Sequence, residues 1–359
     1  MKTFHCICGN KLFFENSLCV CCNREVAWCE VCEGMHAIEP DGHGGYVCTN
    51  PECRSAVVKC YNYSAFNVCN RVIANKGQGQ TQQAQSLCRY CQLTETIPDL
   101  SVDHNMTKWY KLEVAKRRLL YLLDSIGLPY GSKRENFELP LSFDFKEDVQ
   151  PTTLGWLKIG NEEKVYTGHA DGKITINVRE ADSVEREKLR VEMNETHRTL
   201  IGHFRHEIGH YYWQLLVQNK DEEAFKAIFG DHENPSYSDA MNQYYQNGPK
   251  AYWANSYISA YATMHPWEDF AETWGTYLDM IAVLDTADNA DLLELPQEDL
   301  VANQLDTMLQ RYADLSLKVN EVNRSLGLPD LLPETFSKPV VQKLHYIHRL
   351  VSRNRRKPA

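Results

Sequence analysis

The chain has 359 residues, 43% of them hydrophobic, and its 38 basic and 48 acidic side chains give a formal net charge of −10. This composition allows a sizeable core in two or three domains, and the acidic balance argues against a general nucleic-acid binder. Apolar runs such as residues 119–123 are far shorter than the ~20 residues that span a bilayer, and residues 1–10 lack the apolar stretch of a signal peptide. We therefore expect a cytoplasmic protein with no membrane partner.

The first quarter of the chain holds all thirteen cysteines, from Cys6 to Cys91. Their odd number, the missing export signal and several Cys-x-x-Cys spacings favour thiolates on a metal over disulfides. Bound zinc supplies folding free energy that a small, loop-rich segment lacks. We therefore predict a zinc-ribbon module at residues 1–98 and a second domain at residues 99–359.

The second domain begins with a helical pattern at residues 108–126, which closes at Gly127. Residues 173–179 alternate apolar and polar side chains after a hairpin signal at residues 171–172, which predicts a strand. Further helices are predicted at about residues 186–217, 222–228, 253–284, 298–325 and 340–353. A small sheet followed mostly by helices indicates an α+β fold.

The motif that carries chemistry is His206-Glu207-Ile208-Gly209-His210. On a helix, His206 and His210 lie about 40° apart, so that both can bind one metal from one face. Glu207 is rotated by ~100° and suits a general base that takes a proton from a zinc-bound water. Two incidental histidines on a helix are the competing interpretation, but the preceding strand and the later acidic helix favour a catalytic zinc site of the zincin type.

A catalytic zinc usually has three protein ligands, so the histidine pair needs a third. The continuation typical of metzincins is absent, because Trp213 and Leu216 occupy its positions. Glu268 and Glu272 lie one helical turn apart on a later helix, and from spacing alone either can bind zinc while the other accepts the outer N–H of a ligand histidine. A solvated helix start also explains such carboxylates. Tyr261 lies seven residues before Glu268, which is two turns if the helix is continuous, although Pro266 argues for a break or a new helix start. A phenol near the metal could stabilise an oxyanion, although an ordinary packed tyrosine fits nearly as well.

Several motifs follow one another along nearly the whole chain: residues 6–9, 13–16, 97–100, 115–119, 203–210, 229–231, 259–262 and 265–272. In this order they resemble a bacterial family of zinc-binding metallopeptidases with an N-terminal zinc ribbon, related by motif to the gluzincins. The resemblance implies a zincin-like catalytic domain in which Glu268 is the third ligand, Glu272 supports a ligand histidine and Tyr261 lies over the metal. It implies a protein or peptide substrate without specifying one. Zincins usually bind an extended peptide along an edge strand, and residues 173–179 are the candidate.

The cysteine module departs from this family in having enough cysteines for three sites. Cys21 is then the odd thiol, unless it exchanges roles with Cys22, and His36 or His43 could replace a thiolate. Four thiolates leave no position for substrate, so we predict two to three structural zinc ions besides the catalytic one. The three groups are Cys6, Cys8, Cys19 and Cys22; Cys29, Cys32, Cys48 and Cys53; and Cys60, Cys69, Cys88 and Cys91.

The leading prediction is a zinc metallopeptidase that hydrolyses peptide bonds through a zinc-bound water activated by Glu207. One alternative is a binding protein whose zinc ribbons recognise a protein or nucleic acid and whose zincin domain is inactive, although the intact Glu207 argues against it. Another is a hydrolase of non-peptide amides, which the sequence does not distinguish from a peptidase.

Overall fold

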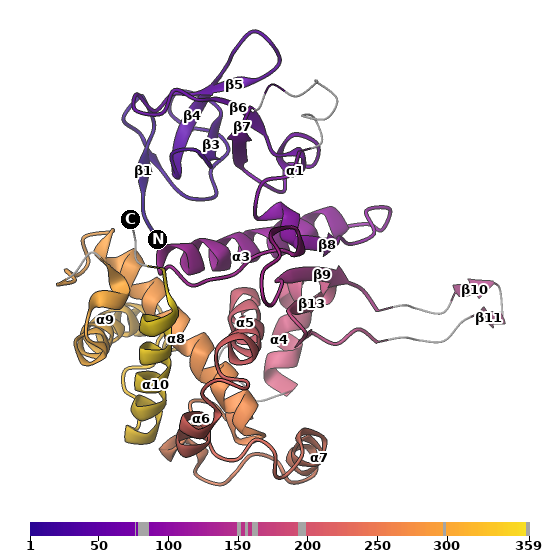
Figure 1. Cartoon of the computed structure of the whole chain (residues 1–359), viewed down its shortest axis with the longest axis vertical. Helices are drawn as coiled ribbons and strands as arrows, with labels where there is room; N and C mark the ends of the chain where they lie inside the picture. Colours follow the sequence, from indigo (N-terminus) through magenta and orange to yellow (C-terminus); the bar gives the residue numbers. More distant parts are fainter. Residues whose placement is uncertain are drawn as a thin grey trace. The chain divides into compact units, whose positions relative to one another are not determined.

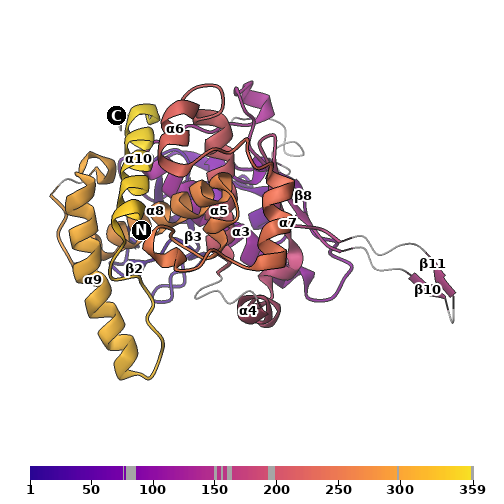
Figure 2. The ribbon, with the colours of Figure 1, turned by 90° about the horizontal axis from the view of Figure 1, so that it is seen from below.

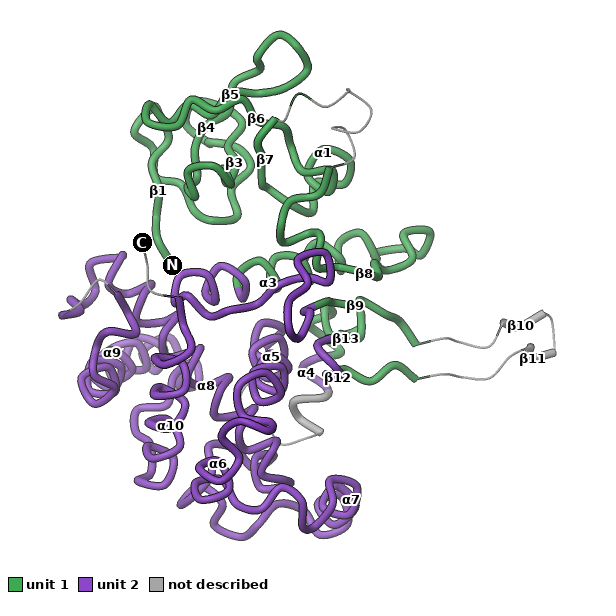
Figure 3. Tube along the Cα trace, viewed as in Figure 1, with its two compact units in different colours: residues 1–118, 142–167, 175–185 green, residues 119–141, 168–174, 186–359 purple. Residues whose placement is uncertain are grey.

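The computed structural model describes residues 1–75, 77, 86–148, 152–154, 157–159, 164–192, 199–296 and 299–356. The chain forms two compact units, drawn in separate colours in Figure 3. Unit 1 comprises Met1–Arg118, Ser142–Thr167 and Thr175–Glu185, and unit 2 comprises Leu119–Leu141, Gly168–Ile174 and Arg186–Ala359. Among the described residues, no helix is long and apolar enough to cross a membrane.

A closed β-barrel forms the centre of unit 1. Successive strands pair antiparallel, and the last pairs parallel with the first. Val26, Met35, Val57 and Val72 are fully buried. Closure leaves the barrel without an edge strand. The barrel was not predicted from the sequence, because its strands are short and interrupted by cysteine loops. The strands are β3 (Val26–Cys29), β4 (Gly34–Pro40), β5 (Tyr46–Cys48), β6 (Ala56–Lys59) and β7 (Arg71–Ala74).

The predicted strand at residues 173–179 is present as β13 (Lys173–Asn177), which follows β12 (Gly168–Ala170). The turn between them needs positive φ at Asp171 (46°) and Gly172 (81°), as the hairpin signal predicted. In the sheet order β12-β13-β9-β8, β13 is an inner strand and β12 is at the edge. The expectation that residues 173–179 form an edge strand is therefore wrong.

The remaining short elements are mostly in unit 1. The strands β8 and β9 pair in parallel, and β1 with β2 and β10 with β11 form antiparallel pairs. Their bounds are β1 (Phe4–His5), β2 (Lys11–Leu12), α1 (Tyr61–Ser64), η1 (Cys91–Leu93), β8 (Thr94–Thr96), η2 (Lys133–Glu135), β9 (Ser142–Lys146), β10 (Thr152–Leu154), β11 (Leu157–Ile159), η3 (Val178–Ala181) and α4 (Ser183–Glu192).

Unit 2 is mostly helical, which agrees with the predicted mixture of helices and a small sheet. In Figure 1, α5 and α8 run side by side, and the view from below in Figure 2 has α7 and α10 on opposite sides of this pair. Its long helices are α5 (Leu200–Leu216), α6 (Glu222–Phe229), α7 (Tyr237–Asn247), α8 (Pro266–Asp288), α9 (Leu305–Ser325) and α10 (Lys338–Asn354), with η4 (Trp253–Asn255), η5 (Tyr261–Thr263) and η6 (Leu300–Ala302) between them. The helix α3 (Asn105–Ser125) belongs to unit 1 as far as Arg118 and to unit 2 from Leu119.

Several predicted helix starts are wrong. The helix predicted from residue 253 begins at Pro266. Proline suits the first turn, and the His265 side chain accepts a hydrogen bond from the backbone N–H of Trp267. The helix predicted from residue 298 begins at Leu305. The long helix predicted at residues 186–217 divides into α4 and α5, and residues 193–198 lie outside the described part of the chain.

Gly209 sets how closely α5 and α8 approach. A Cβ atom at this position would lie 2.9 Å from Cα and 3.1 Å from the carbonyl oxygen of Ala271 on α8. Backbone atoms cannot move aside as a flexible side chain can, so the absent side chain permits the close packing. Tyr212 and Trp274 stack at 4.8 Å between ring centroids beside this contact.

Candidate metal centres

The helix α5 presents His206, Glu207 and His210 in unit 2. It begins after Thr199, whose side chain accepts a hydrogen bond from a backbone N–H of the first turn. The two imidazole centroids are 4.8 Å apart, as expected for residues one helical turn apart. The His210 ring packs against Trp267 at 3.8 Å between centroids, and His210 is almost fully buried. Packing therefore fixes this imidazole in place.

The start of α8 brings Glu268 to the histidine pair. Because α8 begins at Pro266, Glu268 lies in its first turn. Glu268 Oε2 is 3.0 Å from His206 Nε2 and 3.4 Å from His210 Nε2, and the two Nε2 atoms are 3.1 Å apart. Ligand atoms around a tetrahedral zinc are separated by about 3.3 Å when the zinc–ligand bonds are ~2.0 to 2.1 Å. The three atoms thus have the spacing of zinc ligands.

The chemistry of these atoms fits a cation. Glu272 Oε1 lies 2.6 Å from His206 Nδ1, and a carboxylate accepts, so Nδ1 carries a hydrogen. In the neutral ring the lone pair is then on Nε2, where it can bind a metal. Glu268 Oε2 is buried, and it faces the Nε2 atoms of both histidines. Burial lowers the pKa of His206, but hydrogen bonds to Glu268 and Glu272 raise it well above its ordinary value. Burial would raise the pKa of Glu268, yet the positive charge and hydrogen bonds of the two histidines hold it well below its ordinary value. Both pKa shifts show that a positive charge is favourable between the Glu268 carboxylate and the two imidazoles.

Glu207 and Asp269 have different surroundings from the three converging atoms. Glu207 is buried, and burial raises its pKa, whereas the nearby charges of His206 and His210 oppose the rise. A carboxylate with a raised pKa is a better proton acceptor. Asp269 instead forms a buried ion pair with Lys343 on α10, at 2.6 Å. Asp269 is therefore engaged away from the histidines.

Two tyrosines complete the surroundings of Glu268. The ring of Tyr261, in η5, lies 6.1 Å from the His206 ring between centroids. Tyr237, the first residue of α7, donates its hydroxyl hydrogen to Glu268 Oε1 at 2.8 Å. Tyr237 was not predicted from the sequence, because it is 31 residues from Glu268 and lies in no motif. It is one of 19 tyrosines in the chain.

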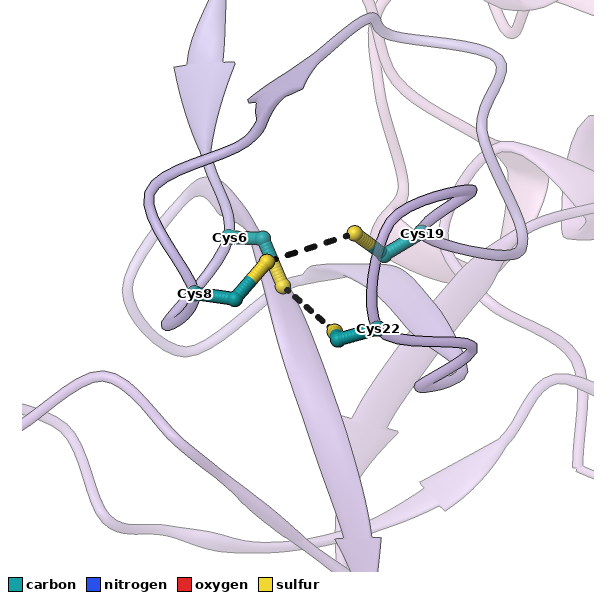
Figure 4. Close-up of side chains that lie close together, drawn as sticks. All are labelled: Cys6, Cys8, Cys19 and Cys22. Carbon is teal, nitrogen blue, oxygen red and sulfur yellow. Dashed lines mark hydrogen bonds between the residues drawn. The ribbon is translucent and has the colours of Figure 1, made fainter.

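The first cysteine group in unit 1 joins two loops. Cys6 and Cys8 come from the turn after β1, and Cys19 and Cys22 from a later loop, with all four sulfurs pointing toward one another (Figure 4). The sulfurs lie within 4.8 Å of one another, with Cys6 to Cys22 at 3.6 Å and Cys8 to Cys19 at 3.7 Å. Cys8 is exposed, so water reaches this group.

The other two cysteine groups flank the barrel strands. The sulfurs of Cys29, Cys32, Cys48 and Cys53 converge within 4.8 Å, and so do those of Cys60, Cys69, Cys88 and Cys91. All four members of the last group are buried. All thirteen cysteines lie in the described part of the chain, and none forms a disulfide.

Each predicted set of four is thus brought together in space, and these groups contain neither Cys21 nor the alternative ligands His36 and His43. Cys21 is exposed beside the first group. Four thiolates form a closed, tetrahedral donor set that suits a structural zinc.

Comparisons with known proteins match a zinc-binding family to the part of the chain that holds the histidine pair and a zinc-ribbon domain to the part that holds the cysteines. The family described as "Putative zinc-binding metallo-peptidase" matches residues 105–350, and a zinc-ribbon domain matches residues 3–102. Uncharacterized proteins of Mycobacterium bovis and of two strains of Mycobacterium tuberculosis are each 34% identical over 358 residues, which cover 98% of this chain and 95% of the relative. No solved structure matches the chain.

Proposed function

Since the chain belongs to this family of zinc-binding metallopeptidases and carries a zinc-ribbon domain, we propose that it is a zincin-like peptidase of the gluzincin type. It hydrolyses peptide bonds in a protein or peptide substrate. The observation that carries the proposal is the convergence of His206 Nε2, His210 Nε2 and Glu268 Oε2, with the buried carboxylate of Glu207 on the same helix as both histidines.

In the proposed mechanism each residue has a separate task. Zinc held by His206, His210 and Glu268 would acidify water and polarise the scissile carbonyl. Glu207 accepts the proton of the attacking water and returns it to the leaving amine. Glu272 keeps the hydrogen of His206 on Nδ1, so that Nε2 stays available as a ligand. Tyr261 is the candidate donor to the oxyanion that forms at the carbonyl.

The proposed zinc content is about four ions per chain, one at the histidine pair and three in the cysteine groups, since each donor set takes one. Zinc in the cysteine groups is structural, because four thiolates fill the coordination shell and leave no place for a substrate. Elemental analysis of the purified chain measures this number directly.

An extended stretch of substrate pairs with a strand in this proposal. The edge strand β12 packs beside α5, which carries the histidines. A strand edge offers free backbone donors and acceptors to a peptide, which gives affinity without a strict sequence preference. The substrate is therefore an unfolded or flexible segment.

The function is tested by comparing cleavage products in a cognate cell lysate treated with the wild-type chain and with Glu207→Gln. We expect new peptide ends only with the wild type and a loss of turnover of roughly 10² to 10⁴-fold in the variant, with zinc content and folding preserved. New peptide ends produced equally by both proteins would remove Glu207 from the mechanism. Their absence from both would contradict a peptidase.

A further inference from the structure

The two oxygens of Glu268 have different partners. Oε2 faces His206 Nε2 and His210 Nε2 at 3.0 and 3.4 Å. Oε1 accepts the hydroxyl hydrogen of Tyr237 at 2.8 Å. A hydrogen bond to a charged acceptor is stronger than one between neutral groups, and this one joins a half-buried phenol to a buried carboxylate. The carboxylate is therefore oriented with one oxygen toward the histidines and one away from them.

The Tyr237 ring is fixed by its neighbours. It packs edge-to-face against His265 at 5.3 Å and against Trp267 at 5.5 Å between centroids. Its backbone begins α7, where the Ser236 hydroxyl accepts a hydrogen bond from Asp239 N–H at 3.2 Å. Because both the ring and the backbone are fixed, little conformational entropy is lost in holding the hydroxyl on Glu268.

We propose that Tyr237 is a positioning residue that restricts Glu268 to a single metal-binding oxygen. The inference rests on the proposed function, namely that Glu268 and the two histidines bind zinc. A carboxylate free to rotate can bind a metal through both oxygens, which would occupy the position that a catalytic site keeps open. The hydrogen bond from Tyr237 uses the second oxygen and opposes that rotation.

The test compares Tyr237→Phe with Tyr346→Phe. Tyr346 is a matched control, because its buried hydroxyl also donates to a carboxylate, Asp221 Oδ2 at 3.0 Å, but this carboxylate is outside the metal group. Zinc affinity is measured by competition with a chelator, and His210→Ala gives the background from the cysteine groups. We expect Tyr237→Phe to weaken the unit 2 zinc by ~10 to 100-fold, as loss of a bond that orients a ligand typically does. Tyr346→Phe should leave zinc affinity unchanged.

Cobalt in place of zinc supplies a readout that a general loss of stability does not produce. Binding of Co²⁺ by a second carboxylate oxygen changes the coordination number, so its d–d absorption should change in Tyr237→Phe and not in Tyr346→Phe. Equal zinc affinity and an equal cobalt spectrum in wild type and Tyr237→Phe would overturn the inference alone. A wild type that binds no more zinc than His210→Ala would overturn the proposed function, and the inference with it.

Discussion

The cysteine groups of unit 1 and the histidine pair of unit 2 differ in how many metal-binding atoms they provide. In unit 1 each group provides four sulfurs, a complete tetrahedral set. In unit 2 the group provides three ligand atoms, and Glu207 and Tyr261, neither of them one of these ligands, lie close by. In the proposed function, this difference separates zinc sites that stabilise the fold from a zinc site that keeps one coordination position open for a reaction.

A second contrast lies within unit 1. The first cysteine group has the exposed Cys8, whereas the third group is fully buried. Zinc with four thiolates carries net negative charge, which is costly to bury without a counter-charge. Burial raises the pKa of the Cys69 thiol, but hydrogen bonds from the other three cysteines of the group, together with the positive charge of the buried Arg117, hold it well below its ordinary value. Arg117 donates to the neutral amide of Asn70, so no carboxylate in that bond cancels its charge.

The largest predicted effect tests this contrast. Cys88→Ser should remove the zinc of the buried third group and unfold unit 1, because a structural zinc supplies ~10 to 16 kcal/mol of apparent binding free energy. Cys8→Ser should weaken only the exposed first group and leave the barrel folded. Zinc content and thermal unfolding of both variants provide the measurement.

Cys21→Ser is the control, because this exposed thiol lies outside all three groups. It should keep the wild-type zinc content and melting temperature. Zinc loss in Cys21→Ser equal to that in Cys8→Ser would show that Cys21 is a ligand, and equal stability of the Cys88 and Cys8 variants would remove burial as the cause of the difference.

The next prediction distinguishes a role of Asp269 in stability from a role in metal binding. Asp269→Ala should lower the free energy of unfolding by roughly 3 to 5 kcal/mol, because it leaves the buried ammonium of Lys343 without its partner. Zinc affinity of the folded protein should stay close to wild type. Denaturant unfolding and chelator competition measure the two quantities, and a stable variant that has lost its unit 2 zinc would make Asp269 a ligand.

The smallest effect is expected at Glu272, three residues further along the same helix. Glu272→Ala should weaken the unit 2 zinc by ~10 to 100-fold with little loss of stability, because it removes only the acceptor that orients His206. Glu268→Ala, measured alongside, should lose that zinc completely. If Glu272→Ala loses it completely and Glu268→Ala keeps it, the two roles are exchanged.

Local patterns explain what the sequence could predict. The two histidines of α5 converge because the spacing of a helix brings them together, and the three cysteine groups are sets of neighbours in the chain. The barrel, in which β7 returns to β3, and the contact between Tyr237 and Glu268 depend on long-range packing. No spacing rule predicts such contacts. The start of α8 at Pro266 agrees with the break that this proline indicates, although the helical range predicted from residue 253 is too long.

Gly209 makes two distant stretches of sequence depend on each other. Any side chain at this position would push against the backbone of Ala271, and Ala271 lies less than one turn after Glu268 on α8. A larger residue within the His-Glu-x-x-His motif would therefore move the carboxylate away from the imidazoles, although it would alter none of the ligands. The two middle positions of the motif are thus not equivalent, because the second requires glycine. Chains with the same packing should have the pattern His-Glu-x-Gly-His, followed downstream by Glu-x-x-Ala-Glu.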